Sequence, residues 1–387
     1  MILLLNIFFA YLGLAVAYQF LLAVASLWPT KQVSIEPRPY RFLVLVPAYK
    51  EDEVITESTL QNLRVDYPSE DYDLVVIGDQ LKASTITKLE YYGASVLMVN
   101  FAVSTKAKSL IHATKLLSLK KYNAIIVLDA DNVMQEQFLN EACKALDTGA
   151  LAIQGQRKAA NFNNAIAVYD AIAENANTAM LCKGTNKLNF SSKLSGSGMI
   201  FRKDIFTKTI LKVSAIGGFD KEMERILTKE KTFIQYWQSA VVYDQKIDSS
   251  ASYSKQRGRW LQAQYAFLLK HMAPSFRALL GGNWDYFHKV WQLALPPRAL
   301  ILVGLAVIFL LALEGAVFYI QAGALSAILI NVLTYVLVTP WNWLKKFSGQ
   351  LLLHLPGFLL SNIKALGFIP RARKSFIHTA HHKPTEA

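Results

Sequence analysis

The sequence predicts an α/β protein in which a mainly parallel sheet, covered by helices on both faces, is attached to a membrane by flanking apolar helices. Short runs rich in Val, Ile and Leu alternate with helix-like stretches between residues 40 and 258, a pattern typical of sheets that are buried on both faces. Long apolar runs lie on both sides of that region. The chain of 387 residues is also apolar and basic, with a formal net charge of +13, which suits a membrane protein with basic cytoplasmic flanks or a nucleic-acid binder.

The first apolar run covers residues 1–28 and contains no Lys, Arg, Asp or Glu. Because about 20 apolar residues span a bilayer, this run predicts a transmembrane helix. A cleaved signal peptide is the alternative, but the run lacks a positively charged start and a small-residue cleavage site, and it is longer than such peptides require. We therefore expect a retained membrane anchor.

Two further transmembrane helices are predicted at 299–320 and 322–339, where only a few small residues separate two apolar runs. They would form a hairpin. Basic residues flank all three predicted spans, namely Lys31, Arg38, Arg41, Arg298, Lys345 and Lys346. Since basic flanks stay in the cytoplasm, we expect an integral plasma (inner) membrane protein whose N-terminus lies outside and whose region 40–258 is cytoplasmic.

Two other segments are expected at the membrane surface. Residues 260–297 are amphipathic and predict interface helices. Residues 347–369 are apolar, but they contain Pro356 and Lys364 and have basic residues on both sides. A span would place one basic cluster outside, so we expect an interfacial or re-entrant helix. The tail at 370–387 then returns to the cytoplasm.

Polar residues follow several of the predicted strands. They occur at Tyr49–Asp52, at Asp79 and at Asp129–Asn132. Open α/β sheets bind ligands beyond the carboxyl ends of their strands, so these residues mark a candidate ligand site. Asp129 and Asp131 are two apart and can face one site, and their hard oxygen atoms suit Mg²⁺ or Mn²⁺ together with phosphates. A strand-end turn with a helix cap is the alternative.

Three more segments carry candidate chemistry, each with a simpler alternative. Lys106 and Lys108 in "STKAKSL" could reach a diphosphate, or they could lie at a solvated helix start. Gly196 and Ser197 in "SGSG" allow close approach of a ligand to the backbone, or they form an ordinary turn. Asp220 or Glu222 in "GGFDKEMERIL" could be a general base, or the acids could simply favour the start of a helix.

The segment "QRGRW" provides Gln256, Arg259 and Trp260. Arginine pairs well with phosphate oxygens, and the flat indole face of tryptophan suits a sugar ring. A basic interface helix with a Trp anchor is the alternative.

In their order and combination these segments resemble the inverting, membrane-integrated glycosyltransferases of family 2, the group that contains cellulose, hyaluronan, chitin and poly-N-acetylglucosamine synthases. The resemblance extends from about Phe42 to Trp260, with "DAD" similar to the family's DxD motif and "QRGRW" to its QxxRW motif. It implies a cytosolic catalytic domain of the GT-A (Rossmann-like) fold at 40–258 and a Mg²⁺ or Mn²⁺ cofactor.

The resemblance also implies roles for individual residues. It assigns nucleotide-sugar binding to Pro47, Ala48, Tyr49, Glu51, Asp79, Lys106, Asp129, Gln256 and Arg259, metal binding to Asp129 and Asp131, and acceptor binding to Gly196, Ser197 and Trp260. The base position departs from the family's Glu-Asp pair. If the segment is matched so that a further acid follows the base at the family's spacing, the base is Glu222. If it is matched by the number of residues to Gln256, the base is Asp220. We prefer Glu222.

The C-terminal "RKSFIHTAHH" resembles, loosely, the gating loop of cellulose-synthase-like enzymes. The matching positions are Lys374, Phe376, His378 and Thr379. A solvated basic tail near acidic lipid is the alternative.

The implied activity is that of a hexosyltransferase, in which a sugar passes from a UDP-sugar to the end of a growing polysaccharide, as in a processive β-glycan synthase. Three predicted spans are fewer than the large synthases have, so a homo-oligomer or an export partner is expected for a polymer product. One alternative is a single addition to a lipid acceptor, as in ceramide glucosyltransferases. Another is an inactive scaffold subunit of an export complex, which the retained motifs disfavour. Nucleic-acid binding is excluded, since the basic residues cluster at membrane flanks.

Overall fold

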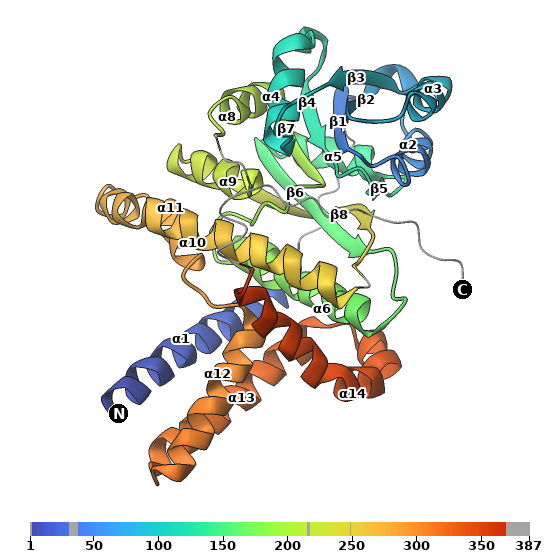
Figure 1. Ribbon diagram of the computed structural model, residues 1–387. Coiled ribbons are helices and arrows are strands. Elements are labelled where there is room, and N and C mark those ends of the chain that lie inside the picture. Colours follow the sequence, from blue (N-terminus) through green and yellow to red (C-terminus); the bar gives the residue numbers. More distant parts are fainter. Residues whose placement is uncertain (1, 31–37, 215–216, 248, 369–387) are drawn as a thin grey trace.

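The computed structural model describes residues 2–30, 38–214, 217–247 and 249–368. A mixed sheet of eight strands forms its centre, in the order β3-β2-β1-β4-β7-β6-β8-β5 (Figure 1). The strands are β1 (Phe42–Tyr49), β2 (Tyr72–Asp79), β3 (Ser95–Val99), β4 (Ala124–Val127), β5 (Val133–Met134), β6 (Ala152–Ala159), β7 (Met199–Arg202) and β8 (Ile234–Asp244). The predicted fold class, a mainly parallel sheet with helices on both faces, is confirmed.

The direction of the strands decides where a ligand site can form. Strands β1, β2, β3 and β4 are parallel, β7 is antiparallel to both β4 and β6, and β8 is parallel to β6. Because β7 is reversed between β4 and β6, the strands on either side of it point the same way. The carboxyl ends of β1, β2, β4, β6 and β8 therefore meet at one edge of the sheet, which we call the ligand edge.

Strand β1 explains why both faces of the sheet are covered. Phe42, Val44 and Val46 point into one hydrophobic core, and Leu43 and Leu45 point into the other, with every one of these side chains buried. An alternating strand that is apolar on both sides requires helices on both sides. The first core includes residues from α2 (Ile55–Asn62), α3 (Ala83–Tyr91) and α5 (Phe138–Asp147), and the second from α4 (Lys106–Leu116), α8 (Lys203–Ile210) and α9 (Phe219–Lys229).

Three helices pack together to form what we call the apolar bundle. They are α1 (Ile2–Ser26), α12 (Arg298–Glu314) and α13 (Phe318–Val338), and they share a core of Leu, Ile, Ala and Val side chains. By length and composition, two of the described helices could span a membrane, Ile2–Leu27 and Phe318–Val338. Helix α12 has only 17 residues. The orientation in a membrane stays a prediction.

The hairpin between α12 and α13 turns earlier than predicted. The expected boundary near residue 321 is wrong, because the chain reverses at 315–317, where Ala316 has a φ of 52°. The small residue Gly323, which suggested a turn, lies inside α13. A Cβ at Gly323 would stand 2.5 Å from Cζ of Phe9, so this glycine permits the close approach of α13 to α1 rather than a change of direction.

A layer of long helices separates the sheet from the apolar bundle (Figure 1). It contains α6 (Ala165–Asn177), which continues through a π-helical turn (Thr178–Gly184) into α7 (Thr185–Lys187), and also α10 (Ser250–Leu280), α11 (Trp284–Gln292) and α14 (Trp341–Leu366). The predicted boundary between a domain at 40–258 and interface helices at 260–297 falls inside α10, so QRGRW lies within one continuous helix. Helix α14 is likewise uninterrupted at Pro356 and begins before the predicted residue 347.

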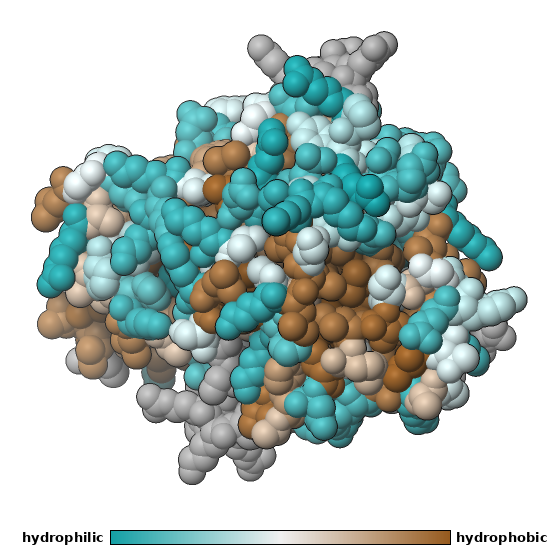
Figure 2. Space-filling model, turned by 90° about the horizontal axis from the view of Figure 1, so that it is seen from above, coloured by the Kyte–Doolittle hydropathy of each residue, from teal (hydrophilic) through white to brown (hydrophobic). Residues whose placement is uncertain are grey.

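The exposed side chains differ between the two parts of the molecule. Viewed from above, polar side chains cover much of the surface around an apolar area (Figure 2). On the helices of the apolar bundle and α14, large apolar side chains are exposed instead, among them Leu3, Leu14, Phe318, Leu352 and Leu353, each more than 70% exposed. Such a surface is costly in water, which agrees with the predicted contact with lipid.

Candidate active site

The ends of β1 and β2 form the first wall of the site. Tyr49 pairs with Asp79 in the parallel ladder, and the backbone N–H of Lys50 donates to the Asp79 carbonyl at 3.1 Å. Pro47 lies in the part of β1 that extends beyond its pairing with β4, where a missing N–H is tolerated. Glu51 is buried directly after the strand.

Asp79 is the most unusual side chain of this wall. It is 1% exposed, and neither carboxylate oxygen has a hydrogen-bond partner among the residues that the structure describes. A buried carboxylate without partners is costly. An N–H donor on a bound ligand would remove that cost, so Asp79 is suited to recognising a heterocyclic base.

Lys106 lies in the centre of the ligand edge, at the first position of α4. Its Nζ is 2.5 Å from Oδ1 of Asp129 and donates to the Gly196 carbonyl at 2.7 Å. The solvated alternative is therefore wrong for Lys106. It is right for Lys108, which is exposed and donates to the Val103 carbonyl.

The DxD segment is held by a chain of hydrogen bonds. The Asn132 side chain donates to Oδ1 of Asp131 at 3.0 Å, the Ser197 hydroxyl donates to Oδ1 of Asn132 at 2.5 Å, and the backbone N–H of Asp129 donates to that hydroxyl at 2.9 Å. The two carboxylates are thus fixed to the Gly196–Ser197 turn. The sequence analysis placed Asn132 among the polar residues at this strand end but gave it no role of its own.

The turn belongs to a loop, residues 191–198, that we call the acceptor loop. Almost every residue of it is anchored. Ser191 donates to Asp285 of α11, the Leu194 N–H to Glu224 of α9 at 2.8 Å, and the Ser195 N–H to Gln154 of β6 at 2.8 Å. Gly196 and Gly198 have φ of 80° and 63°, which other residues adopt only with strain. A loop fixed in this way can hold a reacting group without reorganising.

The two candidate bases lie on different sides of α9. A Cβ placed on Gly196 would stand 4.0 Å from Cβ of Asp220, so Asp220 borders the acceptor loop. The Glu222 carboxylate instead accepts from the N–H and the hydroxyl of Ser214, at 2.9 and 3.2 Å. Successive helical residues are about 100° apart, so residues 220 and 222 diverge while 220 and 224 share a face. These contacts favour Asp220, against our preference for Glu222.

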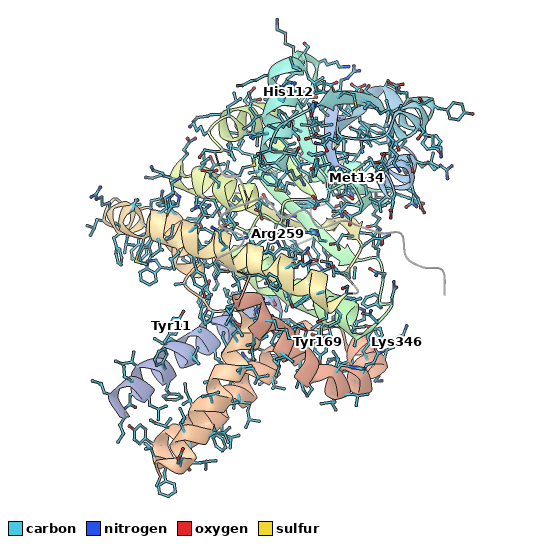
Figure 3. The ribbon with its side chains drawn as sticks, in the orientation of Figure 1. Tyr11, His112, Met134, Tyr169, Arg259 and Lys346 are labelled. Carbon is cyan, nitrogen blue, oxygen red and sulfur yellow. The ribbon has the colours of Figure 1, made fainter. Side chains whose placement is uncertain are left out.

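The QRGRW segment lies on α10, next to the sheet and to α6. Figure 3 places Arg259 between α10 and the sheet, and burial lowers the pKa of its guanidinium. Arg257 binds Asp170 of α6 at 2.5 Å and lies 4.4 Å from the ring centre of Trp260. Trp260 is 41% exposed, which leaves part of its ring free for a sugar. Gln256 is only partly buried in the same turn of the helix.

A buried charge cluster, which the sequence analysis missed, lies beside the acceptor loop. Arg157 donates to the Ser195 carbonyl at 3.0 Å and pairs with Glu174 of α6, at 3.3 Å, and with Asp244 at the end of β8. Lys246 binds the same two carboxylates. Burial acts to lower the pKa of Arg157, but Asp244 and Glu174 outweigh it, so its pKa is raised. The cluster joins α6 to the sheet and to the acceptor loop.

The residues present fit a divalent cation that arrives with its substrate. Asp129 and Asp131 supply two carboxylates at one strand end, and the structure as described contains no group of three or more His, Cys, Asp or Glu side chains that could hold a metal. Mg²⁺ and Mn²⁺ commonly take their remaining ligands from phosphates and water. A diphosphate substrate would complete this donor set.

Comparisons with known proteins agree with this arrangement. Residues 37–263 match the family model described as glycosyltransferase like family 2. No curated protein sequence matches the chain. A solved mannosyltransferase from Pyrobaculum calidifontis, in complex with GDP-Man and Mn²⁺, is 17% identical over 86% of this chain and 97% of that chain, with a TM-score of 0.51. This likeness confirms the GT-A-like fold.

Other similar structures are more distant. Glucosyl-3-phosphoglycerate synthase from Mycobacterium tuberculosis, in complex with Mn²⁺, UDP and phosphoglyceric acid, is 16% identical over 54% of this chain and 72% of that chain, with a TM-score of 0.38. Residues 1–349 of S. aureus TarS are 13% identical over 86% of this chain and 91% of that chain, with a TM-score of 0.37.

Proposed function

Because the chain belongs to glycosyltransferase-like family 2, we propose that it transfers a sugar, with inversion, from a UDP-sugar to the end of a growing β-glycan at the cytoplasmic face of a membrane. The observation that carries this proposal is the position of Asp220, which borders Gly196, the residue whose carbonyl accepts from Lys106, the partner of Asp129. A candidate base and a candidate diphosphate site then meet at one fixed turn.

The proposed donor site uses the first half of the ligand edge. Asp79 accepts from an N–H of the uracil ring, with Pro47, Ala48, Tyr49 and Glu51 around it, and Lys106 and Arg259 with Gln256 bind the diphosphate. A bound Mg²⁺ or Mn²⁺ at Asp129 and Asp131 would neutralise charge on the same phosphates. Cations fixed in advance stabilise the leaving group without reorganisation.

The proposed acceptor site uses the acceptor loop and Trp260. The acceptor sugar stacks on the exposed part of the Trp260 ring and lies against Gly196 and Ser197. Its hydroxyl gives a proton to Asp220 while the oxygen forms a bond to the anomeric carbon. The bond from that carbon to the diphosphate oxygen breaks with its electron pair. Attack on the side opposite to the diphosphate accounts for inversion.

The proposed gating residues Lys374, Phe376, His378 and Thr379 lie outside the described residues. Support for their role comes from where the described chain ends. A Cβ on Gly258 would stand 2.5 Å from Cβ of Phe368, so the last described residue lies beside QRGRW.

The test is an assay of the purified protein in detergent with Mn²⁺ or Mg²⁺. Release of nucleotide from a panel of UDP-sugars, with GDP-mannose included, would be measured, and the products sized by gel and mass spectrometry. A ladder from one donor, lost in Asp131→Asn and Asp220→Asn but kept in the surface control Asp204→Asn, is the expected result.

Two other results would replace the proposal. One sugar on a co-purified lipid would make the protein a lipid glycosyltransferase. Donor binding without turnover, even with cell membranes added, would indicate a scaffold subunit. A ladder that survives Asp220→Asn but is lost in Glu222→Gln would return the base to Glu222.

A further inference from the structure

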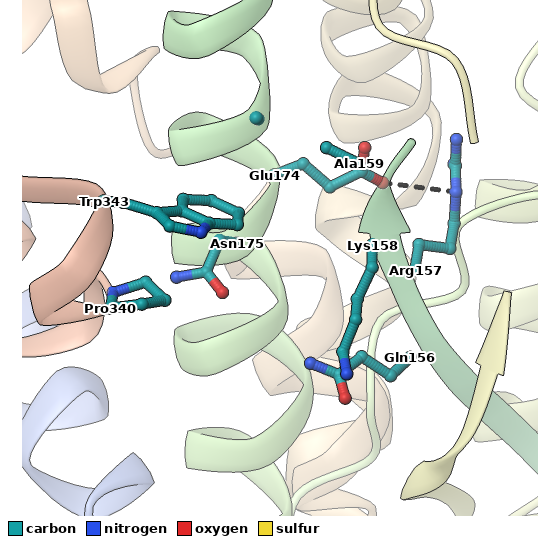
Figure 4. Close-up of a pocket in the computed structure, with 9 residues that line it drawn as sticks. Gln156, Arg157, Lys158, Ala159, Glu174, Asn175, Pro340 and Trp343 are labelled. Carbon is teal, nitrogen blue, oxygen red and sulfur yellow. Dashed lines mark ion pairs between the residues drawn. The ribbon is translucent and has the colours of Figure 1, made fainter. Parts of the chain in front are cut away.

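A cavity of about 100 Å³ lies at the carboxyl end of β6, between the sheet, α6 and the first turn of α14. Figure 4 shows Gln156, Arg157 and Lys158 of β6 on one side of it, and Glu174, Asn175 and Trp343 on the other. Because β6 and β4 end at the same edge of the sheet, the cavity is lined by residues from the edge that also carries Asp129.

The side chains around the cavity fall into two groups. Arg157 and Glu174 bind each other, and the Asn175 amide donates to the Val338 carbonyl at 2.6 Å, so these three serve the fold. Gln156 and Lys158 are two apart on the strand and project to the same side. No hydrogen bond or ion pair of their side chains occurs within the described part of the chain.

Trp343 supplies an aromatic wall opposite these two polar groups (Figure 4). Its position is fixed by an edge contact with Phe162, at 4.9 Å between ring centres. An aromatic face together with a free amide and a free amine is suited to a hydroxyl-rich ring, which has an apolar face and a polar rim. An acyl chain would leave the amide and the amine unpaired. A diphosphate would need available cations, and Arg157 is already neutralised by Glu174 and Asp244.

The side chain of Arg157 connects the cavity to the acceptor loop. Arg157 lines it and also donates to the Ser195 carbonyl at 3.0 Å. Ser195 precedes Gly196, which borders Asp220. A ring bound in the cavity would therefore contact the same side chain, Arg157, that holds the acceptor loop.

We propose that this cavity is a binding subsite for an inner sugar of the glycan acceptor, which stacks on Trp343 and hydrogen-bonds to Gln156 and Lys158. The proposal rests on the proposed function, because only a protein that extends a glycan meets an acceptor with inner sugars. The subsite makes longer acceptors better substrates and leaves the chemical step unchanged.

The test compares acceptors of different length. Short glycans released by the wild-type protein would be fractionated from one to six sugars and offered with the donor, and kcat and KM measured for each. The variants are Trp343→Ala, Trp343→Phe and Lys158→Met. The matched control is Trp341→Ala, since Trp341 lies on the same helix, is 65% exposed and does not line the cavity.

In wild type, kcat/KM should rise at the acceptor length that first fills the subsite. Trp343→Ala should raise KM about two- to tenfold for acceptors of that length and longer, as expected for one aromatic contact, with little change for a single sugar. Trp343→Phe should restore part of the effect, and Trp341→Ala should behave as wild type.

Two outcomes would overturn the subsite. One is a KM unchanged in Trp343→Ala at every length, and the other is an equal loss at every length including a single sugar, which would point to a general distortion. Transfer to the longest acceptor reports on the proposed function by itself. Its absence in wild type would refute that function, whereas its presence without any length dependence would refute only the subsite.

Discussion

Replacing Arg157 with Met tests how the acceptor side of the site is held together. The cluster of Arg157, Lys246, Glu174 and Asp244 contains two cations and two anions and is formally neutral. Arg157→Met keeps much of the side-chain volume but leaves one uncompensated negative charge in a buried place. Removing one partner of a buried ion pair costs about 3–5 kcal/mol, so we expect a loss of that size in the free energy of unfolding.

Activity should fall as well, because the acceptor loop loses the bond from Arg157 to the Ser195 carbonyl. A hydrogen bond from a charged donor contributes about 1.5–3 kcal/mol. Denaturant unfolding in detergent, followed by Trp fluorescence, gives the stability, and nucleotide release gives the activity. The matched control is Lys208→Met. Lys208 pairs with Glu230 on the surface with 60% of its side chain exposed, and such pairs contribute about 0–1 kcal/mol.

A double variant separates charge from packing. Arg157→Met with Asp244→Asn removes one charge of each sign, so it should regain more than half of the stability lost in the single variant but not the activity. Two results would refute this reasoning by showing that the cluster does not act as a neutral unit. One is a double variant whose loss of stability equals the sum of the two single losses, and the other is a loss below about 1 kcal/mol in the free energy of unfolding of Arg157→Met.

Three other changes test separate features. Asp79→Asn should stabilise the protein without ligand, since it removes a buried carboxylate that has no partner among the described residues. It should raise the KM for the donor about tenfold or more, since a hydrogen bond to a charged acceptor is lost. An unchanged KM for the donor would contradict the role of Asp79. Burial, and next the charge of Arg225, lower the pKa of His271 to about 4. The contribution of neutral His271 to the stability of the folded protein is therefore complete above pH 6.5 and is lost as the pH falls toward 4. The melting temperature of His271→Gln should depend less on pH between 6.5 and 4 than that of wild type. Gly184→Ala should lower the free energy of unfolding by about 1–3 kcal/mol, because a Cβ there would clash with the Leu22 carbonyl of α1. The control Gly349→Ala should leave it unchanged, because open space surrounds that glycine. Equal melting temperatures for the two variants would contradict the close packing at Gly184.

The residues of the proposed donor site could be brought together from sequence because they lie at the ends of strands. Asp79 and Asp129 each follow a short apolar run, and parallel strands bring their carboxyl ends together whatever the loops do. For Lys106 the residue pattern alone left two alternatives open, since a lysine at a helix start is usually solvated, and the resemblance favoured the diphosphate site. The bond of Lys106 to Asp129 depends on where α4 packs, which no local pattern reports.

The choice of base shows what a match by order leaves out. Matching acids by their order favoured Glu222, but order ignores the helical period. At about 100° per residue, residues 220 and 222 point in different directions, so at most one of them can face the acceptor loop. Which one does so depends on how α9 packs: Asp220 and Glu224 share the face that meets the acceptor loop, and Glu222 faces Ser214. No local pattern reports that packing, and the identity of the base stays a prediction.

The surroundings of the proposed acceptor side could not be predicted, for a different reason. Arg257 binds Asp170 across 87 positions of the chain, and Trp343 reaches the cavity at β6 from a helix that follows the apolar bundle. Arg257 occupies a variable position of QxxRW, and no motif marks Asp170 or Trp343. These contacts arise only when α6, α10 and α14 pack in one layer. This division explains why the sequence reports a reaction class and not an acceptor. It also means that acceptor preference can change through substitutions on α6 and α14 while the DxD and QxxRW residues stay the same, so two chains with identical motifs can make different products.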